Sequence, residues 1–518
     1  MTGLRRLAKI ASMFGVTGGT VFIIKKNDWE ISTVGALRFG RAAVTAARIV
    51  CDYKMTMYHL NPEDEQYADK RSQLHTRSAV RLRELCCANG GAFIKVGQHL
   101  GALDYLLPAE YVQTLKVLHS EAPQSSLEDL YSVIEEDLGK KVSEIFTTFD
   151  PQPLGAASLA QVHKATLRDG RVVAVKVQHV KVKAHSFVDI KTMEILVKLV
   201  AWLFPDFQYV WLAEETKKNL PLELDFLNEG RNCERVGRMF KHFRFLKVPA
   251  IYWDLSSERV LTMEFCEGGK VDNRDYMTKH GISVNEVTRS LGKLYSEMIF
   301  VHGYVHCDPH PGNVLVKKTD QGVEISLLDH GLYQSLTDEF RVNYSKLWMS
   351  LINADQKGIK HYSSLMNAGD LYPLFACMLT ARSWTAVSSG IANKEFSAKE
   401  GEEIKSSVAD YFPQISQILN RIPRQMLLLL KTNDVLRSIE HSLKTRSNAT
   451  SFINMSRCCI RSVGQYELQH CQSRMCKIRV SINTHWHLFV ISVYEFSLWL
   501  QSTVMGQTFS RIFKHRVI

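Results

Sequence analysis

The sequence of 518 residues contains 11 cysteines but no C-x-x-C motif. Four of the cysteines form the adjacent pairs Cys86-Cys87 and Cys458-Cys459. This spacing suggests neither a zinc ribbon nor a disulfide framework, so we expect the thiols to be mostly reduced. A hydrophobic run long enough to cross a bilayer is also missing. The run from Ile10 to Ile24 spans 15 residues, whereas about 20 are needed.

A basic stripe interleaved with aromatic residues, which would indicate a nucleic-acid groove, is absent too. The net charge of +11 is concentrated at the two ends of the chain. Residues 1–60 hold nine Lys or Arg and three Asp or Glu (+6), residues 440–518 hold ten and three (+7), and the difference leaves −2 for the middle. Cationic ends on a near-neutral core favour targeting or an anionic membrane surface over nucleic acid.

The first 27 residues carry basic side chains and no acidic one, with apolar residues in between. This composition is typical of a mitochondrial targeting segment, and a basic amphipathic helix lying on a membrane is the alternative. The G-x-x-x-G motif of Gly15 and Gly19 would suit helix packing if the segment inserts into a bilayer. We therefore expect residues 1–60 to be a targeting and candidate anchor segment, and the protein to associate with the mitochondrial inner membrane.

The stretch VHGYVHCDPHPGNVLV contains an H-x-D-x-x-x-x-N motif formed by His306, Asp308 and Asn313, and a D-H-G triplet begins 21 residues after Asp308, at Asp329. An Asp in such a loop accepts a hydroxyl proton, while the Asn and the second Asp hold Mg²⁺ against ATP phosphates. Each triplet alone is common. Their order, their spacing and their place on one predicted hairpin make Asp308 the candidate catalytic residue and Asn313 and Asp329 the candidate Mg²⁺ ligands.

Strands are also predicted upstream, where PLGAASLAQVHKATLRDGRVVAVKVQ reads as a small-residue turn, a strand, an Asp-Gly hairpin and a second strand that carries Lys176. A Lys in a V-A-V-K strand suits contact with the α and β phosphates of ATP and needs a carboxylate partner. The turn has no G-x-G-x-x-G, but its small side chains still let backbone N–H groups approach phosphate. Its residues are Gly155, Ala156, Ala157 and Ser158.

Three carboxylates follow in PLELDFLNEG, at positions i, i+2 and i+6. Because Glu223, Asp225 and Glu229 cannot share one helix face, they have at least two destinations, and Glu229 is the predicted partner of Lys176. The later LTMEFCEGG reads as a strand and a glycine turn. It is a candidate hinge whose backbone from Glu264 to Cys266 would meet adenine, and an ordinary edge strand is the alternative.

Helical patterns surround these strands. Residues 72–140 are predicted to be helical, with the last helix opened by a Ser126-x-x-Asp129 capping box and closed by Gly139. Within this region lies the K-V-G-Q of Lys95 and Gln98, and the pattern alone places Lys95 at the solvated edge of a helix. VDIKTMEILVKLVAWLF is predicted to pack on the sheet. The pattern weakens beyond about residue 445, and HLFVISVYEFSLWL is interpreted as a surface or membrane-facing amphipathic element.

The motifs KVGQ, GAASLAQVH, VAVK, ELDFLNE, HCDPHPGN and DHG occur here in the order found in the AarF-domain (UbiB-like) atypical kinases, which the chain resembles from about Gly90 to His441. The resemblance implies an α+β, protein-kinase-like, two-lobed fold with an N-terminal helical extension and a largely helical C-lobe. The expected parts are residues 72–140 (extension), 148–265 (N-lobe with a helical insert), 266–441 (C-lobe) and 445–518 (basic amphipathic tail).

The same resemblance implies that Lys95 and Gln98 lie in the kinase cleft and are regulatory, and that Glu223 and Asp225 help to hold the extension. This corrects the surface interpretation of Lys95. Two departures from the family pattern stand out: His330 replaces the usual Phe of D-F-G, and Gly155 stands where Ala is frequent.

Members of this family are linked to isoprenoid quinone and lipid metabolism, and show ATP binding or ATPase activity more readily than protein phosphorylation. The implied cofactors are ATP and Mg²⁺. The implied partners are a mitochondrial membrane lipid or quinone-related small molecule and membrane proteins, with no nucleic acid. The expected function is an ATPase or a small-molecule or lipid kinase. A nucleotide-binding scaffold is the alternative, and an antibiotic-type phosphotransferase should lack K-x-G-Q.

Overall fold

The computed structural model describes residues 29–58, 66–101, 107–119, 124–204, 210–390, 400, 411–444 and 449–502. The predicted targeting segment of residues 1–27, with its G-x-x-x-G motif, lies outside the described residues. The chain divides into two compact units. We call Met1–Gly230 with Ala250–Phe265 the N-terminal unit, and Arg231–Pro249 with Cys266–Ile518 the C-terminal unit.

The N-terminal unit contains an antiparallel sheet with the strand order β1-β3-β4-β6, in which β2 also pairs with β3. These strands are β1 (Phe146–Phe149), β2 (Gly155–Ala156), β3 (Ala160–Leu167), β4 (Val172–Gln178) and β6 (Val260–Glu264). The predicted Asp-Gly turn joins β3 to β4, and Gly170 has a φ of +86° there. Glycine adopts this backbone conformation without the steric cost of a Cβ atom.

Strand β4 presents two different faces, because successive side chains of a strand point to opposite sides. Val173, Val175 and Val177 are fully buried in a cluster with α6 (Leu127–Leu138) and α7 (Val142–Ile145). Ala174 lies in a second cluster, with Phe226 of α10 (Phe226–Met239). Lys176 lies two residues after Ala174 on β4, so both side chains are on the same face of the strand. The Lys176 side chain therefore points toward α10.

Helix α6 begins and ends as the sequence predicts. Ser126 is the N-cap, and its hydroxyl oxygen accepts a hydrogen bond from the Asp129 N–H group at 3.2 Å. Gly139 follows the helix with a φ of +65°. A serine N-cap and a left-handed glycine satisfy backbone groups that a helix end otherwise leaves without partners.

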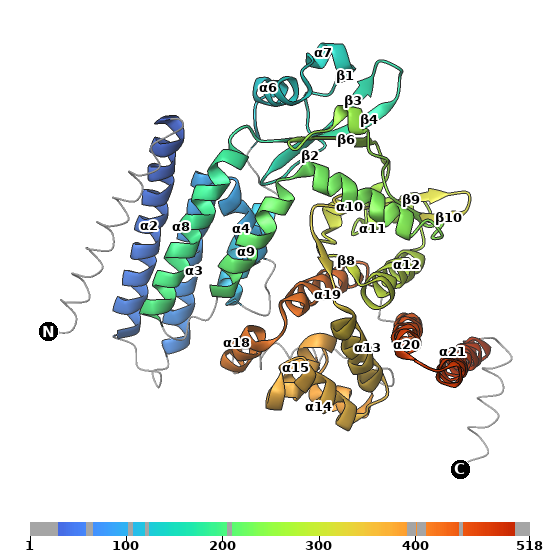
Figure 1. The fold of residues 1–518 in the computed structure, drawn as a ribbon. Helices are drawn as coiled ribbons and strands as arrows, with labels where there is room; N and C mark the ends of the chain where they lie inside the picture. Colours follow the sequence, from blue (N-terminus) through green and yellow to red (C-terminus); the bar gives the residue numbers. More distant parts are fainter. Residues whose placement is uncertain are drawn as a thin grey trace. The chain divides into compact units, whose positions relative to one another are not determined.

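The other described helices of the N-terminal unit pack mainly on one another, and α2, α3 and α8 lie side by side (Figure 1). We predicted that α8 packs on the sheet, and this is wrong, because α8 packs against α2, α4 and α9. A buried ion pair from Arg38 Nε of α2 to Asp189 Oδ1 of α8, at 2.8 Å, adds a polar contact to this packing. These elements are α2 (Trp29–Tyr58), α3 (Tyr67–Asn89), α4 (Ala92–Gly101), α5 (Ala109–Lys116), η1 (Val117–His119), α8 (Val182–Leu203), α9 (Val210–Glu223) and, beside the sheet, η2 (Trp253–Leu255).

The glycine of the K-V-G-Q motif permits a close approach of helices. A Cβ atom at Gly97 would lie 2.4 Å from Leu118 Cδ1 and 3.1 Å from Cys86 Sγ. Both atoms belong to side chains, so a larger residue at this position would have to displace Leu118 and Cys86, which are buried. Glycine lets α4 lie close to α3 and η1 without this rearrangement.

The C-terminal unit contains two small sheets, with the strand orders β5-β10-β9-β7 and β11-β8. Strands β9 and β10 form the predicted antiparallel hairpin, in which Val314 lies opposite Leu327. In the second sheet His306 lies opposite Tyr333. The strands are β5 (Leu246–Lys247), β7 (Gly269–Lys270), β8 (Tyr304–His306), β9 (Val314–Thr319), β10 (Gly322–Leu327) and β11 (Tyr333–Ser335).

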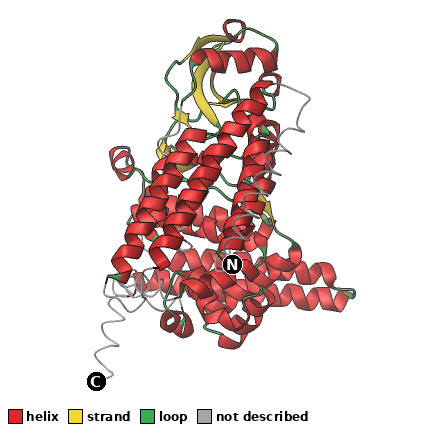
Figure 2. Cartoon of the chain, turned by 90° about the vertical axis from the view of Figure 1, so that its left-hand side faces the viewer, coloured by secondary structure: helices red, strands yellow, loops and turns green. Residues whose placement is uncertain are grey.

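Helices make up most of the described chain (Figure 2), and the predicted α+β class with a helical lobe is confirmed. The helical segments of the C-terminal unit are α11 (Arg274–Lys279), α12 (Val284–Ser296), the π-turn η3 (Glu297–His302), η4 (Pro311–Asn313), α13 (Asp338–Ile352), α14 (Gln356–Leu365), η5 (Gly369–Leu371), α15 (Tyr372–Thr380), α16 (Trp384–Ser389), α18 (Phe412–Arg421), α19 (Arg424–Ser442), α20 (Ala449–His470) and α21 (Arg474–Ser502).

Residues 449–502 are more regular in structure than the weak sequence pattern indicates. Helix α20 packs on α12 and α13 and buries Ile453 and Cys459, and α21 packs on α20. A disulfide joins Cys471 to Cys476 at the connection of these two helices, and the other nine cysteines are thiols. No described helix has the length and apolar character that a membrane crossing requires.

Candidate functional site

Lys176 and Glu229 form a buried ion pair in the N-terminal unit. Lys176 Nζ donates hydrogen bonds to both carboxylate oxygens of Glu229, at 2.8 Å each. The Glu229 side chain is 2% exposed and the Lys176 side chain 13%. A buried carboxylate without a cation would carry a large desolvation penalty, so the pair ties α10 to β4. The structure joins the two residues that the sequence pairs, and their contact with a nucleotide stays a prediction.

The predicted phosphate loop is held by contacts inside the N-terminal unit. Gly155 and Ala156 form β2 and pair with β3. The Ala157 N–H group donates to the carbonyl oxygen of Ala160 at 2.8 Å, which closes a tight turn. The Ser158 hydroxyl is buried and donates to Gln98 Oε1 at 3.2 Å. The loop is therefore braced by the K-V-G-Q helix α4.

His179 also forms a hydrogen bond with the predicted phosphate loop. His179 Nε2 donates to the Ala157 carbonyl oxygen at 3.1 Å, and its Nδ1 accepts from the Ser125 hydroxyl at 2.7 Å. Burial lowers the pKa of His179, so the ring is neutral and can donate from one nitrogen while it accepts at the other.

Lys95 is not at a solvated helix edge, so the interpretation from pattern alone is wrong. Its Nζ lies 2.5 Å from Glu223 Oε2, and the two side chains are 17% and 7% exposed. Gln98, one turn further on α4, is also buried, and its Nε2 donates to the Leu118 carbonyl oxygen at 2.9 Å. Lys95 therefore joins α4 to the end of α9.

Asp225 has a different role from the one that the resemblance implied. Its Oδ1 accepts hydrogen bonds from the N–H groups of Leu227 (3.0 Å) and Asn228 (3.3 Å). It thus caps the start of α10 instead of pairing with Lys95, because a carboxylate at a helix N-terminus satisfies backbone donors.

The predicted hinge lies where the chain passes between units. Glu264 ends β6, and its backbone N–H donates to the Ala250 carbonyl oxygen at 2.8 Å. The N-terminal unit ends at Phe265 and the C-terminal unit resumes at Cys266. Contact of Glu264 and Cys266 with adenine stays a prediction.

Asp308, Asn313 and Asp329 lie in the C-terminal unit, and the hairpin β9–β10 brings two of them to one end. Val314 lies opposite Leu327, so Asn313 before β9 and Asp329 after β10 flank the same end of the hairpin. The Asn313 carbonyl oxygen accepts from the Leu328 N–H group at 2.9 Å. Asn313 Nδ2 donates to the Asp308 carbonyl oxygen at 3.2 Å, which brings the H-x-D loop to the same end.

These groups fit an Mg²⁺ ion bound together with a nucleotide. In the part of the chain that the structure describes, no cluster of three or more His, Cys, Asp and Glu side chains could hold a metal by itself. Mg²⁺ is commonly held by one or two carboxylates together with substrate phosphates and water. Because Asn313 Nδ2 is used by the Asp308 carbonyl oxygen, the amide oxygen of Asn313 is the atom left for a cation.

Two buried histidines shape the D-H-G turn. His306 Nε2 donates to the Asp329 carbonyl oxygen at 2.5 Å, and its Nδ1 accepts from the Tyr295 hydroxyl at 3.1 Å. Burial lowers the pKa of His306, which keeps the ring neutral. His330, in the place of the usual Phe, donates to the Leu327 carbonyl oxygen at 3.0 Å and lies parallel to the Tyr333 ring. Polar contacts thus set the position of the Asp329 backbone.

The sequence reasoning missed Lys431. This residue of α19 places its Nζ 3.0 Å from Asp308 Oδ1, and its side chain is 11% exposed. The H-x-D loop has no Lys or Arg between His306 and Asn313, so this cation comes from a helix more than 100 residues away in the sequence. No local motif marks Lys431. The only available signal was its position directly after the apolar run MLLLL of α19.

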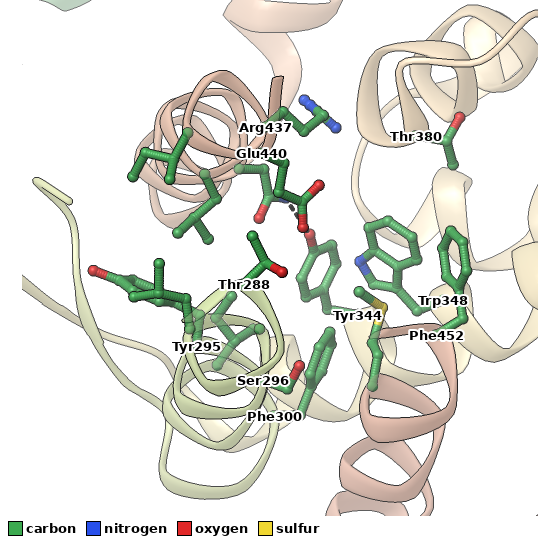
Figure 3. A pocket seen from close by; sticks show the side chains of 17 residues that line it. Thr288, Tyr295, Ser296, Phe300, Tyr344, Trp348, Thr380, Arg437, Glu440 and Phe452 are labelled. Atoms are coloured by element: carbon green, nitrogen blue, oxygen red, sulfur yellow. Dashed lines mark hydrogen bonds between the residues drawn. The ribbon is translucent and has the colours of Figure 1, made fainter. Parts of the chain in front are cut away.

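A cavity of about 140 Å³ lies among the helices of the C-terminal unit (Figure 3). Side chains from α12, α13, α19 and α20 surround it, and Tyr344 and Trp348 line it together with Phe300 and Phe452. None of the predicted site residues lines this cavity. Tyr295 also lines the cavity, and its hydroxyl donates to His306, so the cavity lies next to the H-x-D motif.

The chain is similar to one family of known proteins. The model of the ABC1 atypical kinase-like domain matches residues 117–363. AarF domain-containing protein kinase 1 of Gallus gallus is 58% identical over 504 residues, which are 97% of this chain and 97% of that protein. The chain belongs to the ABC1/AarF family of atypical kinase-like proteins. The family membership predicted from the motifs is confirmed.

Other members of the ABC1/AarF family are similar over most of the chain. AarF domain-containing kinase 1 of Drosophila melanogaster is 47% identical and covers 94% of this chain and 96% of its own length. The ABC1 family protein MCP2 homolog of Schizosaccharomyces pombe is 38% identical, with 81% and 78% covered. The matched ABC1 range includes Lys176, Glu229 and the Asp308 loop, whereas Lys95 lies before it and Lys431 after it.

Proposed function

We propose that this ABC1/AarF chain binds Mg-ATP and either hydrolyses it or transfers its γ-phosphate to a small or lipid-like molecule. The proposal rests on the side chains in each unit that are of the types used for phosphoryl transfer. The N-terminal unit holds the Lys176–Glu229 pair, and the C-terminal unit gathers Asp308, Asn313 and Asp329 at one end of a hairpin. Membership of an atypical kinase-like family supports this reaction class.

In the proposed mechanism each of these residues has one task. Lys176, oriented by Glu229, contacts the α and β phosphates, and Asp308 accepts the proton of the attacking hydroxyl or water. Asn313 and Asp329 hold Mg²⁺, which when bound neutralises charge on the transferred phosphoryl group. Lys431 keeps a positive charge beside the Asp308 carboxylate and orients it. Gly155 to Ser158 and the backbone of Glu264 and Cys266 remain the predicted nucleotide contacts.

A nucleotide-binding scaffold is the second candidate. The loop contacts favour it, because the Ala157 N–H group and the Ser158 hydroxyl are already used inside the N-terminal unit. Measurement of ATP turnover in wild type and in Asp308→Asn separates the two functions. Binding of Mg-ATP without any turnover above that of Asp308→Asn would favour the scaffold.

We also propose a location at the mitochondrial inner membrane, with a membrane lipid or quinone-related molecule and membrane proteins as partners. The acid-free basic segment of residues 1–27 and the two cationic ends support this location. A tagged protein without residues 1–27 should fold but lose its mitochondrial location, and an unchanged location would contradict the targeting role.

Asp329→Asn should weaken the Mg²⁺-dependent part of ATP binding, because it removes a charged ligand from a hard cation. In a thermal-shift titration, ATP with MgCl₂ should stabilise wild type by about 2.7 kcal/mol at a hundredfold excess over Kd. The variant should lose most of this stabilisation. Asp320→Asn, at the exposed turn of the same hairpin, is the matched control and should behave as wild type. Equal Mg-ATP stabilisation of the Asp329 variant would refute the ligand assignment.

Lys431→Ala should lower kcat for ATP turnover by roughly 100-fold, the usual effect of removing one group that stabilises charge at a reacting centre. The KM for ATP should change little, because the lysine contacts Asp308 rather than the nucleotide in this proposal. Lys431→Arg should restore part of the rate. Lys346→Ala removes a more exposed lysine that pairs with Glu467 at 4.0 Å, and serves as the control. A folded Lys431→Ala protein with normal turnover would rule out the positioning role.

Lys95→Ala should retain Mg-ATP binding and show equal or higher turnover. Removal of the Lys95 ammonium group breaks the contact of α4 with Glu223. The same helix contacts the predicted phosphate loop through the hydrogen bond between Gln98 and Ser158. The variant should be less stable, since breaking a buried ion pair costs about 3–5 kcal/mol.

The double variant Lys95→Ala/Glu223→Ala should recover part of that stability, because neither charge is then left alone. Lys176→Ala is the comparison for nucleotide contact and should lose ATP affinity. If folded Lys95→Ala binds ATP normally but has no turnover, Lys95 is a catalytic residue and not a regulatory residue that restrains the enzyme through its contact with Glu223.

A further inference from the structure

Helix α21 exposes a continuous row of large apolar side chains, which we call the outer face. Each member of the row is between 50% and 76% exposed. Apolar side chains that occur singly on a surface are ordinary, but a contiguous row of this length marks an interaction surface. The outer face consists of Met475, Ile478, Ile482, Trp486, Phe489, Val493 and Phe496.

The row is straight along the helix. Its members follow one another at intervals of three or four residues, the spacing that keeps side chains on one side of an α-helix. From Met475 to Phe496 the row extends about 32 Å at the rise of an α-helix. The outer face is therefore long enough to contact a flat surface along its whole length.

The opposite side of α21 is occupied by α20, which fixes the rotation of the helix. Arg457 of α20 pairs with Glu495 at 2.6 Å and donates to the Ser492 hydroxyl at 3.2 Å. Nearby, Gly464 of α20 lies so close to Thr484 that a Cβ atom would approach its Oγ1 to 2.4 Å. Because these contacts hold the inner side, α21 cannot turn its apolar row inward without breaking them.

The basic residues of α21 lie near its N-terminal end. Arg474, Lys477 and Arg479 are exposed, and no ion pair to them occurs in the described part of the chain. Glu495 is the single acidic residue of the helix, and Arg457 neutralises it on the inner side. Residues 496–518 add three basic residues and no acidic one. The charged side chains that the structure describes at the N-terminal end of α21 are thus complementary to negative charge.

We propose that the outer face of α21 docks on a lipid bilayer that carries anionic headgroups, with the helix lying along the bilayer surface. Aromatic and aliphatic side chains would enter the boundary of headgroups and acyl chains, and the basic residues would bind the headgroups. The helix is not expected to cross the bilayer, in agreement with the lack of a membrane-spanning helix among the described residues.

A second copy of this chain fits the outer face less well. Two outer faces packed in parallel would bring the Arg474–Arg479 ends together, and like charges at close range repel. An antiparallel pair would need acidic groups opposite these cations, but Glu495 is the only acid on the helix and already pairs with Arg457. Charge complementarity therefore favours the anionic bilayer.

The test is co-sedimentation of the full chain with two kinds of vesicle, in the absence of nucleotide. One kind contains phosphatidylcholine alone, and the other contains equal amounts of phosphatidylcholine and phosphatidylglycerol. The triple variant Ile482→Gln/Trp486→Gln/Phe489→Gln should raise the apparent Kd for anionic vesicles by about tenfold or more. Its unfolding temperature should match that of wild type, because the replaced side chains are exposed.

The matched control is Phe187→Gln/Ile195→Gln/Trp202→Gln, which removes three exposed apolar side chains from α8. It should bind vesicles as wild type does. A charge variant, Arg474→Gln/Lys477→Gln/Arg479→Gln, should lose the preference for anionic over neutral vesicles and should respond less to added salt.

Unchanged vesicle binding by the α21 triple variant would overturn the proposal, and so would loss of binding in the α8 control alone. Light scattering of the same proteins tests the second-copy alternative. A wild-type dimer that the α21 variant converts to a monomer, with equal vesicle binding, would assign the face to self-association instead. The proposal extends the proposed membrane role, but its test uses no ATP. Failure of vesicle docking can thus be distinguished from failure of phosphoryl transfer.

Discussion

A carboxylate as deeply buried as Glu229 is stable only beside a cation, and β4 provides that cation on one of its two faces. The alternation of β4 is what makes this possible. Its valines at 173, 175 and 177 pack with α6 and α7, and the residues between them meet α10. A shift of one residue in strand register would place a lysine in the valine cluster and a valine against a buried carboxylate. The apolar core and the ion pair therefore specify the same register.

The K-V-G-Q helix depends on a second constraint, the space left by a missing Cβ atom at Gly97. With α4 in this position, Lys95 reaches Glu223 and Gln98 reaches Ser158. The loop of small side chains from Gly155 to Ser158 is thus held by hydrogen bonds with Gln98 and His179. Its rigidity comes from hydrogen bonds to side chains, whereas a glycine-rich loop would keep greater backbone freedom.

Much of this arrangement was predictable because it is local in the sequence. The β3–β4 and β9–β10 hairpins, the cap of α6 by Ser126 and the partner of Lys176 all follow from turn residues, alternation and spacing. The errors concern contacts that pattern does not encode. An apolar helix face does not reveal whether it covers a sheet or other helices, so α8 was misplaced. Asp225 accepts hydrogen bonds from the backbone N–H groups two and three residues further along the chain. Lys431 contacts Asp308, from which it is separated by 123 residues in the sequence.

The C-terminal unit connects its last helices to its H-x-D loop through contacts with η3. Arg461 of α20 pairs with Glu297 in η3, and Arg341 of α13 donates to two carbonyl oxygens of η3 (3.0 and 2.9 Å) and to Ser462 of α20 (3.2 Å). A π-turn disturbs the regular helical hydrogen bonds, and Arg341 satisfies carbonyl groups there. Because η3 leads into β8 and His306, the α20–α21 hairpin and the H-x-D motif are held by one network of contacts. A surface that binds the outer face of α21 would therefore also fix the orientation of the H-x-D loop relative to that surface.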